Sequence, residues 1–138
     1  MRISTAGVAE RNGRYLVALR RPGTSIGEKW EFPGGKVNGE ESPEDALKRE
    51  FFEEFTVNIT VDLRFCTGNF SNKGTDYRLQ AYWVHILSDS FFLKEHQSVK
   101  WCTLRELEAL PMAESDRIIV RCLERMKTDV KPDSVPAE

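Results

Sequence analysis

The stretch from Gly34 to Val57 constrains this chain most, because it joins a strong helix start to a dense set of carboxylates. It contains six glutamates and one aspartate. Ser42 is a favourable N-cap residue, and Pro43 suits the first position of a helix. We therefore expect a helix from Pro43 to Phe55. A pair of glycines opens the preceding loop, where glycine allows the backbone to approach a ligand closely.

The expected helix has two neighbouring stripes. Leu47, Phe51 and Phe55 recur at helical spacing, and we expect this apolar stripe to face the core. Positions three and four apart are neighbours on a helix surface. The same spacing therefore predicts an acidic stripe beside the apolar one, formed by Glu50, Glu53 and Glu54.

The acidic stripe has two interpretations. Like charges at these spacings destabilise a helix by about 0.2–0.5 kcal/mol per pair, and Arg49, four residues before Glu53, can offset part of that. A divalent cation would turn the repulsion into coordination, since hard cations take carboxylate oxygens as ligands. The alternative is an acidic helix face that only contacts solvent.

The spacing around this helix resembles the Nudix box, G-x5-E-x7-R-E-U-x-E-E-x-G-U, in which U is a bulky apolar residue. The matching positions are Gly35, Glu41, Arg49, Glu50, Phe51, Glu53, Glu54 and Val57. Phe51 is aromatic where aliphatic residues are commoner, and Thr56 replaces the motif glycine. That glycine lies just past the helix, where a left-handed backbone is often needed. Thr56 is therefore either strained or marks a different helix end.

The resemblance implies a metal-dependent hydrolase of phosphoanhydrides that uses Mg²⁺ or Mn²⁺. It assigns the metal ligands to Gly35, through its carbonyl, and to Glu50, Glu53, Glu54 and Glu95. It assigns water activation to Glu53, Glu50 or Glu95, and the orientation of the glutamates to Arg49. Glu41 is expected to tie the loop to the helix, with a metal role as the alternative. The alternative for Glu95 is a charged loop residue. His96 could do acid–base work, but beside a glutamate in a loop we expect it to be solvated.

Further stretches resemble the MutT-type branch of the family, which hydrolyses nucleoside triphosphates, over nearly the whole chain from Ile3 to about Met126. Trp30 to Lys36 resembles the W/L-E-F-P-G-G-K segment of that branch, and Leu110 to Asp116 resembles its P-x-A-x-A-D/N segment. The resemblance implies that four residues bind the substrate, namely Arg21, Phe32, Lys36 and Asp116.

Each of these four residues has a plainer alternative. The counterpart of Arg21 approaches the sugar or the phosphates and Lys36 could contact phosphate, but either could be a solvated surface cation. Phe32 lies where the branch places an aromatic ring against the base, and it could equally pack in the core. Asp116 matches the residue that hydrogen-bonds the base, and it could instead cap or solvate the last helix.

The rest of the chain reads as strands mixed with helices. Asn12 and Gly13 predict a hairpin. Residues 58–70 and 77–87 predict paired antiparallel strands joined by a turn over residues 72–74, and residues 99–102 predict a short strand. A polar loop is expected over residues 20–29, and a helical turn after Thr103 precedes a last helix over residues 114–127. The resemblance implies an α/β fold, the Nudix-type α/β/α sandwich with a mixed central sheet. We expect one domain over residues 1–127 and a flexible tail over residues 128–138.

Composition excludes several functional classes. The net charge is −2, with 40% hydrophobic and 30% charged residues, which does not support a broad surface for stable nucleic-acid binding. The sequence has no apolar run of about 18 residues that would span a membrane, and its start lacks the apolar core of a secretion signal. These features predict a cytoplasmic protein with a small-molecule nucleotide substrate. A monomer and a homodimer are both compatible with them.

The cysteines predict no metal or redox motif. Cys66, Cys102 and Cys122 are far apart, odd in number and without CxxC spacing. We expect free, mostly buried thiols, as in a reducing cytosol.

The favoured function is cleavage of a nucleoside triphosphate, or of a modified or oxidised one, to monophosphate and pyrophosphate, which would cleanse the nucleotide pool. One alternative is a Nudix hydrolase of another nucleoside diphosphate derivative, such as a nucleotide sugar or a dinucleotide. Another is a non-catalytic module that binds a nucleotide. Such modules usually lose glutamates of the box, whereas this chain keeps all of them.

Overall fold

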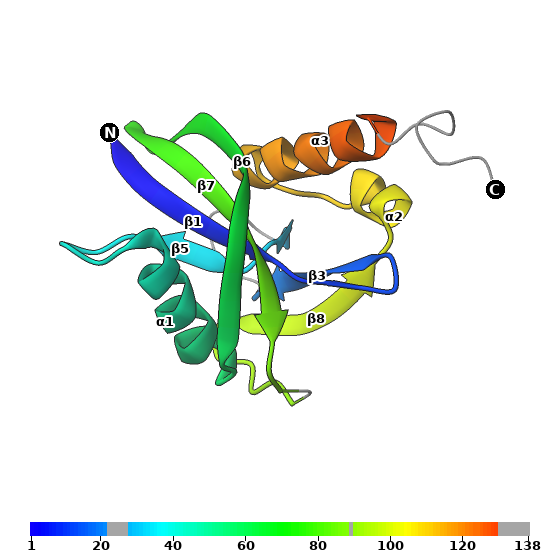
Figure 1. Ribbon diagram of the computed structural model, residues 1–138, viewed down its shortest axis with the longest axis horizontal. Coiled ribbons are helices and arrows are strands. Elements are labelled where there is room, and N and C mark those ends of the chain that lie inside the picture. Colours follow the sequence, from blue (N-terminus) through cyan, green and yellow to red (C-terminus); the bar gives the residue numbers. More distant parts are fainter. Residues whose placement is uncertain (22–27, 89, 130–138) are drawn as a thin grey trace.

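The computed structural model describes residues 1–21, 28–88 and 90–129 of the chain. Figure 1 shows strands packed between helices, with α1 and α3 well separated. The elements are β1 (Arg2–Val8), β2 (Glu10–Arg11), β3 (Arg14–Arg20), β4 (Trp30–Glu31), β5 (Gly34–Lys36), α1 (Pro43–Phe55), β6 (Ile59–Asn72), β7 (Thr75–Ile86), β8 (His96–Cys102), α2 (Leu104–Ala109) and α3 (Glu114–Asp129).

The described strands form two sheets. The first has the order β5-β1-β7-β6, in which β1 and β7 are parallel and the other neighbours are antiparallel. In the second, β2 and β4 pair along one edge of β3, and β8 pairs along the other. This confirms the predicted α/β fold with a mixed sheet, and it adds that the strands are divided between two sheets.

Helices α1 and α3 cover opposite faces of the first sheet (Figure 1). The register places Gly7 of β1 and Gly68 of β6 beside residues of β7 that point to different faces. A Cβ atom on Gly7 would lie 2.7 Å from Phe51 of α1, and one on Gly68 would lie 2.8 Å from Ile118 of α3. Both helices therefore approach the sheet as closely as glycine permits.

The expected apolar stripe of α1 is buried. Leu47, Phe51 and Phe55 are fully inaccessible to solvent, and they pack with Tyr82 and Val84 of β7. Burial of each such side chain stabilises the fold by about 1.5–3 kcal/mol. This face therefore fixes how α1 is rotated on the sheet, and with it the direction of the acidic stripe.

The two ends of α1 have different capping chemistry. At the start, the Ser42 hydroxyl accepts a hydrogen bond from the Asp45 N–H at 3.1 Å, as predicted. At the end, Thr56 adopts the left-handed conformation, with φ 56° and ψ 40°, and its N–H donates to the Phe52 carbonyl. The helix therefore ends as the motif glycine would end it, with a β-branched residue in a conformation that costs about 1–2 kcal/mol.

The predicted turns are also present. Asn12 and Gly13 both have positive φ, as do Lys73 and Gly74 in the turn between β6 and β7, and this matches the primed turns that suit hairpins. Thr103 forms a full capping box with Glu106 at the start of α2. By contrast, β8 begins at His96, within the segment that was expected to be a loop.

The prediction of free thiols is wrong for two of the three cysteines. Cys66 of β6 and Cys122 of α3 form a disulfide, with their Cα atoms 6.1 Å apart, while Cys102 is free and buried. The two bonded residues are 56 positions apart in sequence, so no local spacing reveals the pair. The packing of α3 across β6 brings them together.

Two predictions fall on residues outside the described ranges. Residues 22–27 of the expected polar loop and residues 130–138 of the expected tail are not part of the described chain. The division into a domain over residues 1–127 and a tail therefore stays a prediction.

The described helices include none that is long and apolar enough to cross a bilayer.

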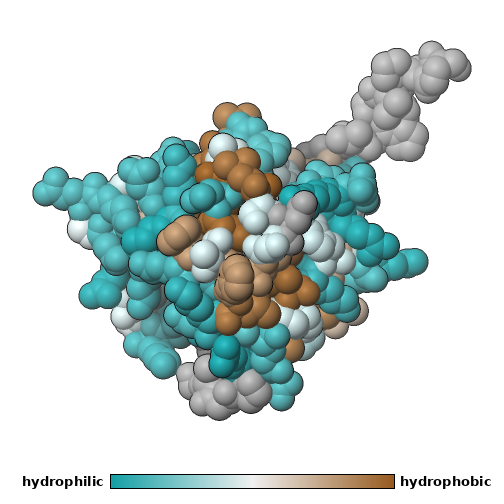
Figure 2. Space-filling model, turned by 90° about the horizontal axis from the view of Figure 1, so that it is seen from below, coloured by the Kyte–Doolittle hydropathy of each residue, from teal (hydrophilic) through white to brown (hydrophobic). Residues whose placement is uncertain are grey.

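Apolar side chains gather near the centre of the face shown in Figure 2, and hydrophilic residues surround them. Exposed large apolar residues include Phe52 of α1, Leu87 and Phe92. The Phe92 N–H donates to the Phe55 carbonyl, so the connection between β7 and β8 is held at the end of α1.

Replacing Thr56 by glycine should stabilise the protein. Thr56→Gly removes the steric cost of the left-handed backbone, and the greater freedom of glycine in the unfolded chain offsets part of the gain. We expect the free energy of unfolding to rise by about 0.5–1 kcal/mol, which thermal denaturation should show as a melting temperature about 2–4 °C higher. Thr60→Gly, at an exposed position of β6, is the matched control and should lower stability. A Thr56→Gly protein less stable than the parent would contradict the strain at this helix end.

Candidate active site

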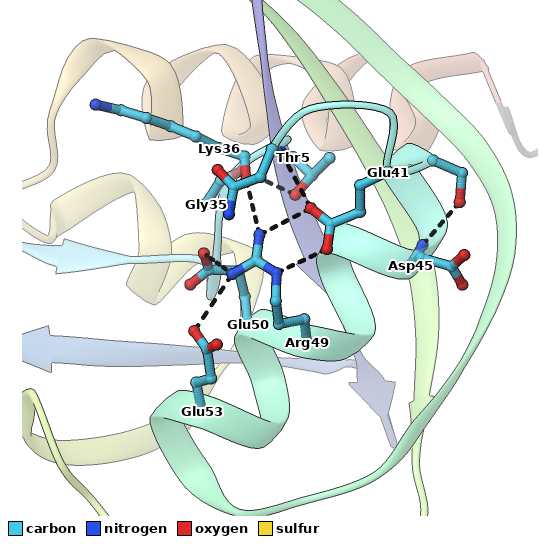
Figure 3. Close-up of polar contacts among 10 residues, drawn as sticks. Thr5, Gly35, Lys36, Glu41, Asp45, Arg49, Glu50 and Glu53 are labelled. Carbon is cyan, nitrogen blue, oxygen red and sulfur yellow. Dashed lines mark hydrogen bonds and ion pairs between the residues drawn. The ribbon is translucent and has the colours of Figure 1, made fainter.

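Arg49 is the hub of the acidic cluster on α1 (Figure 3). Its Nε and one terminal nitrogen donate to the two carboxylate oxygens of Glu41, at 2.7 and 3.0 Å. The other terminal nitrogen donates to Glu50 at 3.0 Å and to Glu53 at 3.3 Å, and a further bond reaches the Lys36 carbonyl at 3.0 Å. One cation thus contacts three carboxylates and the backbone of β5.

Glu41 ties the loop before α1 to the helix, as predicted. Besides the paired contact with Arg49, its carboxylate accepts a hydrogen bond from the Asn38 N–H at 3.0 Å. The hydrogen bonds from Arg49 and then from the Asn38 backbone lower the pKa of Glu41 to about 2. This carboxylate therefore stays ionised and holds Arg49 in place.

Gly35 lies where no side chain would fit. A Cβ atom there would be 2.5 Å from the carboxylate of Glu50. Pairing of β1 with β5 sets Thr5 beside Gly35, and the Thr5 hydroxyl donates to the Gly35 carbonyl at 2.9 Å. The first glutamate of the acidic stripe thus rests directly on the backbone of β5.

Glu54 is the buried member of the stripe, with 8% of its surface exposed. Burial raises the pKa of Glu54, and the hydrogen bond and charge of Glu50 and the charges of Glu31 and Glu95 add to the rise. Its Oε1 is buried and has no hydrogen-bond partner among the described residues. A carboxyl group among other carboxylates is stabilised either by a proton or by a cation.

The described residues do not hold a ready coordination shell. Within them, no three histidine, cysteine, aspartate or glutamate side chains are grouped so that they could hold a metal ion. Glu50 and Glu54 lie together, whereas the Glu53 side chain is 59% exposed and turned toward Arg49. Glu95 is exposed on the segment just before β8.

A cavity of about 470 Å³ adjoins this cluster. Its walls include Glu54 from α1, Glu95 from the segment before β8, and Asp116 from the first turn of α3. It therefore connects the carboxylates near α1 with a carboxyl group presented by the helix on the other face of the sheet.

The four predicted substrate residues are placed unequally around this cavity. Phe32 is 4% exposed, belongs to the core and also lines the cavity. Lys36 lines the cavity with its Nζ 5.5 Å from the centre of the Tyr77 ring. Arg21 is exposed, donates to the Leu93 carbonyl at 3.4 Å and is not among the described residues that line the cavity.

A partly buried ion-pair network beside the cavity was not predicted from sequence. Glu31 of β4 accepts from Arg20 at 2.8 Å and contacts Nε2 of His96 at 2.7 Å. Burial alone would raise the pKa of Glu31, but the hydrogen bond from His96 and the charge and hydrogen bond of Arg20 outweigh it and lower the pKa. Glu31 is therefore an ionised carboxylate in the wall of the cavity.

The prediction of a solvated His96 is wrong. His96 is 3% exposed and stacks on Phe55 with ring centres 5.2 Å apart. Because β8 starts at this residue and pairs with β3, the ring turns inward beside α1. The sequence held one signal for this contact, namely the charged Glu31 between the aromatic residues Trp30 and Phe32. A carboxylate between apolar neighbours needs a polar partner, and His96 is such a partner.

Asp116 is also buried, with 7% of its surface exposed. Its Oδ1 accepts a hydrogen bond from the Phe32 N–H at 2.9 Å, so it fixes β4 to the start of α3. Burial raises the pKa of Asp116 to about 8, although the Phe32 hydrogen bond acts in the opposite direction. At neutral pH much of this group is a protonated carboxyl, which can donate as well as accept a hydrogen bond.

The geometry matches a known family. The model of the NUDIX domain family matches residues 1–123. The chain belongs to the Nudix family. This confirms the sequence prediction of a Nudix pyrophosphohydrolase acting on phosphorus-containing acid anhydrides.

Curated Nudix relatives lie at moderate identity. The CTP pyrophosphohydrolase of Escherichia coli strain K12 is 33% identical over 111 residues, which cover 80% of this chain and 82% of the relative. The protein named putative 8-oxo-dGTP diphosphatase 2 of Mycobacterium tuberculosis is 33% identical over 118 residues, covering 83% and 82%.

Solved structures agree with this fold. The solution structure of the Escherichia coli ORF135 protein superposes with a TM-score of 0.82 at 30% identity, over 100% of this chain and 95% of that one. The MutT protein of Methanosarcina mazei, at 22% identity and a TM-score of 0.80, covers 94% of both chains and supports the fold alone.

The raised pKa of Asp116 predicts a pH-dependent stability difference. Its ordinary pKa is 3.8 and its folded pKa about 8, so the group favours folding below about pH 4 and loses that contribution as pH rises toward 8. Asp116→Asn keeps an acceptor for the Phe32 N–H and cannot ionise. We expect the stability of Asp116→Asn relative to the parent to rise between about pH 5 and 8, by at most about 1.4 kcal/mol per pH unit.

Denaturant titrations at several pH values measure this difference. Glu114→Gln removes an exposed carboxylate from the same turn of α3 and is the matched control. A stability difference for Asp116→Asn that stays constant over this pH range would refute the assignment.

Proposed function

We propose that this protein is a divalent-metal-dependent hydrolase of nucleoside triphosphates, releasing a monophosphate and pyrophosphate. The observation that supports this most is a cavity whose walls include both Glu54 of α1 and Asp116 of α3. A triphosphate needs charge neutralisation beside its phosphate chain, and a base needs a polar group that recognises it. The cavity offers both types of group on its walls.

The residues around α1 offer the oxygen ligands that a divalent cation takes, although the described residues do not group three of these side chains as they stand. Glu54 presents a buried oxygen without a partner and faces the charges of Glu50, Glu31 and Glu95, so a cation would relieve the repulsion. Glu50, Glu53, Glu54, the Gly35 carbonyl and Glu95 would hold Mg²⁺ or Mn²⁺. Mg²⁺ keeps several of its waters and needs only a few carboxylates per ion, which suits an open cluster. When bound, the ion would neutralise charge on the phosphates and acidify a water.

The chain's own residues would position and deprotonate the attacking water. Glu53, Glu50 or Glu95 would accept its proton, and Arg49 would hold the first two in place through the contacts described above. The hydroxide would attack a phosphorus of the triphosphate in line with the departing phosphate oxygen. Because Glu53 is exposed and rests only on Arg49, we favour it as the base.

The remaining walls would hold the nucleotide. Asp116 would bind the base edge and Phe32 would pack against the ring, while Lys36 would contact a phosphate as a point charge. Arg21 would have to leave the Leu93 carbonyl to reach a sugar or phosphate. The names of the two curated relatives make CTP and 8-oxo-dGTP the first nucleotides to test. We also propose action on the cytoplasmic nucleotide pool.

A pyrophosphate-release screen with Mg²⁺ tests the proposal. We expect turnover of at least one nucleoside triphosphate among ordinary, oxidised and methylated forms, and its loss when a chelator removes the metal. Cleavage of nucleotide sugars and dinucleotides releases no pyrophosphate, so these compounds are tested in parallel by following the formation of nucleoside monophosphate. Cleavage of these alone would favour the alternative hydrolase. Tight nucleotide binding without any release would favour a binding module and contradict the proposal.

The charge of Glu53 should be needed for turnover and dispensable for folding. Glu53→Gln keeps the shape of the side chain and removes its ability to accept a proton, so we expect kcat to fall by roughly 100-fold or more. Because the side chain is largely exposed, the melting temperature should change little. Glu44→Gln in the first turn of the same helix is the control and should keep parental activity. Parental turnover by a folded Glu53→Gln protein would overturn this role.

A further inference from the structure

The disulfide between Cys66 and Cys122 joins a strand of the first sheet to the last helix. Cys66 belongs to β6 of the first sheet, and Cys122 belongs to α3. The first turn of α3 contains Asp116, and the second contains Ile119, both of which line the cavity. A covalent bond between β6 and α3 therefore fastens one wall of the cavity to the sheet.

The surroundings of Cys122 differ from those of a purely structural cysteine. A terminal nitrogen of Arg125, one turn further along α3, lies 3.2 Å from the Cys122 sulfur. Arg125 is exposed, so its guanidinium links the buried sulfur to the surface. A cation at this position stabilises a thiolate, which is the form that leaves in thiol–disulfide exchange. By contrast, Cys102 is buried as a free thiol and forms no disulfide.

We propose that Cys66 and Cys122 form a reversible thiol–disulfide site that takes an external dithiol as its reductant. Cys66 and Cys122 are 4% and 6% exposed, so the dithiol reaches the bond when α3 opens locally from β6. One thiolate of the dithiol attacks the Cys66 sulfur, and the bond to Cys122 breaks with its electron pair on the sulfur beside Arg125. The second thiol of the reductant then displaces Cys66. The protein gains two electrons and two protons as a dithiol, and the reductant becomes a disulfide. An external disulfide carries out the reverse reaction.

Reduction changes how firmly the cavity wall is held. In the oxidised protein the crosslink closes a chain segment of 56 residues, which restricts the unfolded chain. In the reduced protein, α3 is held to β6 by non-covalent contacts, including Ile118 against Gly68 and the Cys66 sulfur at 3.8 Å from the Ile118 carbonyl. The first turns of α3 then open more often, while the carboxylates of α1 on the other face keep their Arg49 contacts.

The test compares the full-length protein after treatment with oxidised and with reduced dithiothreitol. Peptide mapping of the alkylated protein should show the Cys66–Cys122 link only in the oxidised sample. Reduction should lower the melting temperature by roughly 5–15 °C, and should speed hydrogen exchange of the amides at residues 114–119. Free Cys66 and Cys122 in the oxidised sample, or unchanged exchange in α3 after reduction, would each overturn the proposal.

Variants separate this crosslink from general effects of thiols. Cys66→Ala and Cys122→Ala should resemble the reduced parent under both treatments, and Cys102→Ala, which leaves the pair intact, should respond to reduction as the parent does. If an alanine variant does not fold, the reversible response of the parent still decides the question. If the Cys66→Ala variant responds to reduction as strongly as the parent does, the response does not come from the Cys66–Cys122 disulfide and the proposal is refuted.

The kinetic consequence rests on the proposed function. With a nucleoside triphosphate as substrate, reduction should raise KM about threefold or more, because Asp116 is held less firmly, and should leave kcat within about twofold. An unchanged KM would overturn the link between the crosslink and the cavity. The protein could lack turnover in both redox states while its Cys66–Cys122 bond and its hydrogen exchange in α3 still respond to reduction. That result would count against the proposed function and not against the thiol site.

Discussion

The cluster of contacts around Arg49 is the constraint on which the candidate active site depends. Placing several carboxylates on one short helix is unfavourable, because adjacent negative charges repel one another. Arg49 offsets this by contacting Glu41, Glu50 and Glu53 with a single planar guanidinium. Pairs that are partly exposed contribute little to stability individually, at most about 1 kcal/mol. Their main effect is positional, since they fix the loop, the helix and β5 relative to one another.

The carboxylates are held against backbone as well as against Arg49. Glu50 occupies the space that a side chain on Gly35 would need, and the Gly35 carbonyl is bound by Thr5 from the neighbouring strand. The buried apolar stripe of α1 sets the rotation of the helix, so that Glu54 faces inward while Glu53 faces solvent. The candidate active site thus lies at the boundary between a packed core and an ion-pair cluster.

The opposite side of the cavity depends on different interactions. Asp116 accepts a hydrogen bond from the Phe32 N–H, directly after β4, and Glu31 of β4 is held by Arg20 and His96. Asp116 and His96 are buried and Glu31 and Arg20 are partly buried, so each needs a partner to compensate for the loss of water. The segment from Glu31 to Phe32 therefore carries polar contacts to β3, β8 and α3.

Local patterns were sufficient for part of this structure. The helix over Pro43–Phe55, its Ser42 cap and both hairpin turns were predicted from sequence, because they depend on residues close together in the chain. The mixed α/β fold was predicted from the family resemblance, since its strand pairing joins distant residues. The burial of Leu47, Phe51 and Phe55 followed from spacing alone. The same patterns could not show whether a polar side chain points to the interior or to solvent. For that reason they predict a solvated His96, which is in fact buried.

The sequence by itself determined the acidic helix and the family to which the chain belongs, since the motif is contiguous and its spacing is set by helical geometry. Only the tertiary structure decided that Glu54 is buried while Glu53 is exposed, that Glu31 joins Arg20 and His96, and that Cys66 meets Cys122. Each of these depends on how α1 and α3 pack on opposite faces of one sheet. Contacts between residues distant in the chain are chosen by the packing of whole elements, and no local spacing encodes them.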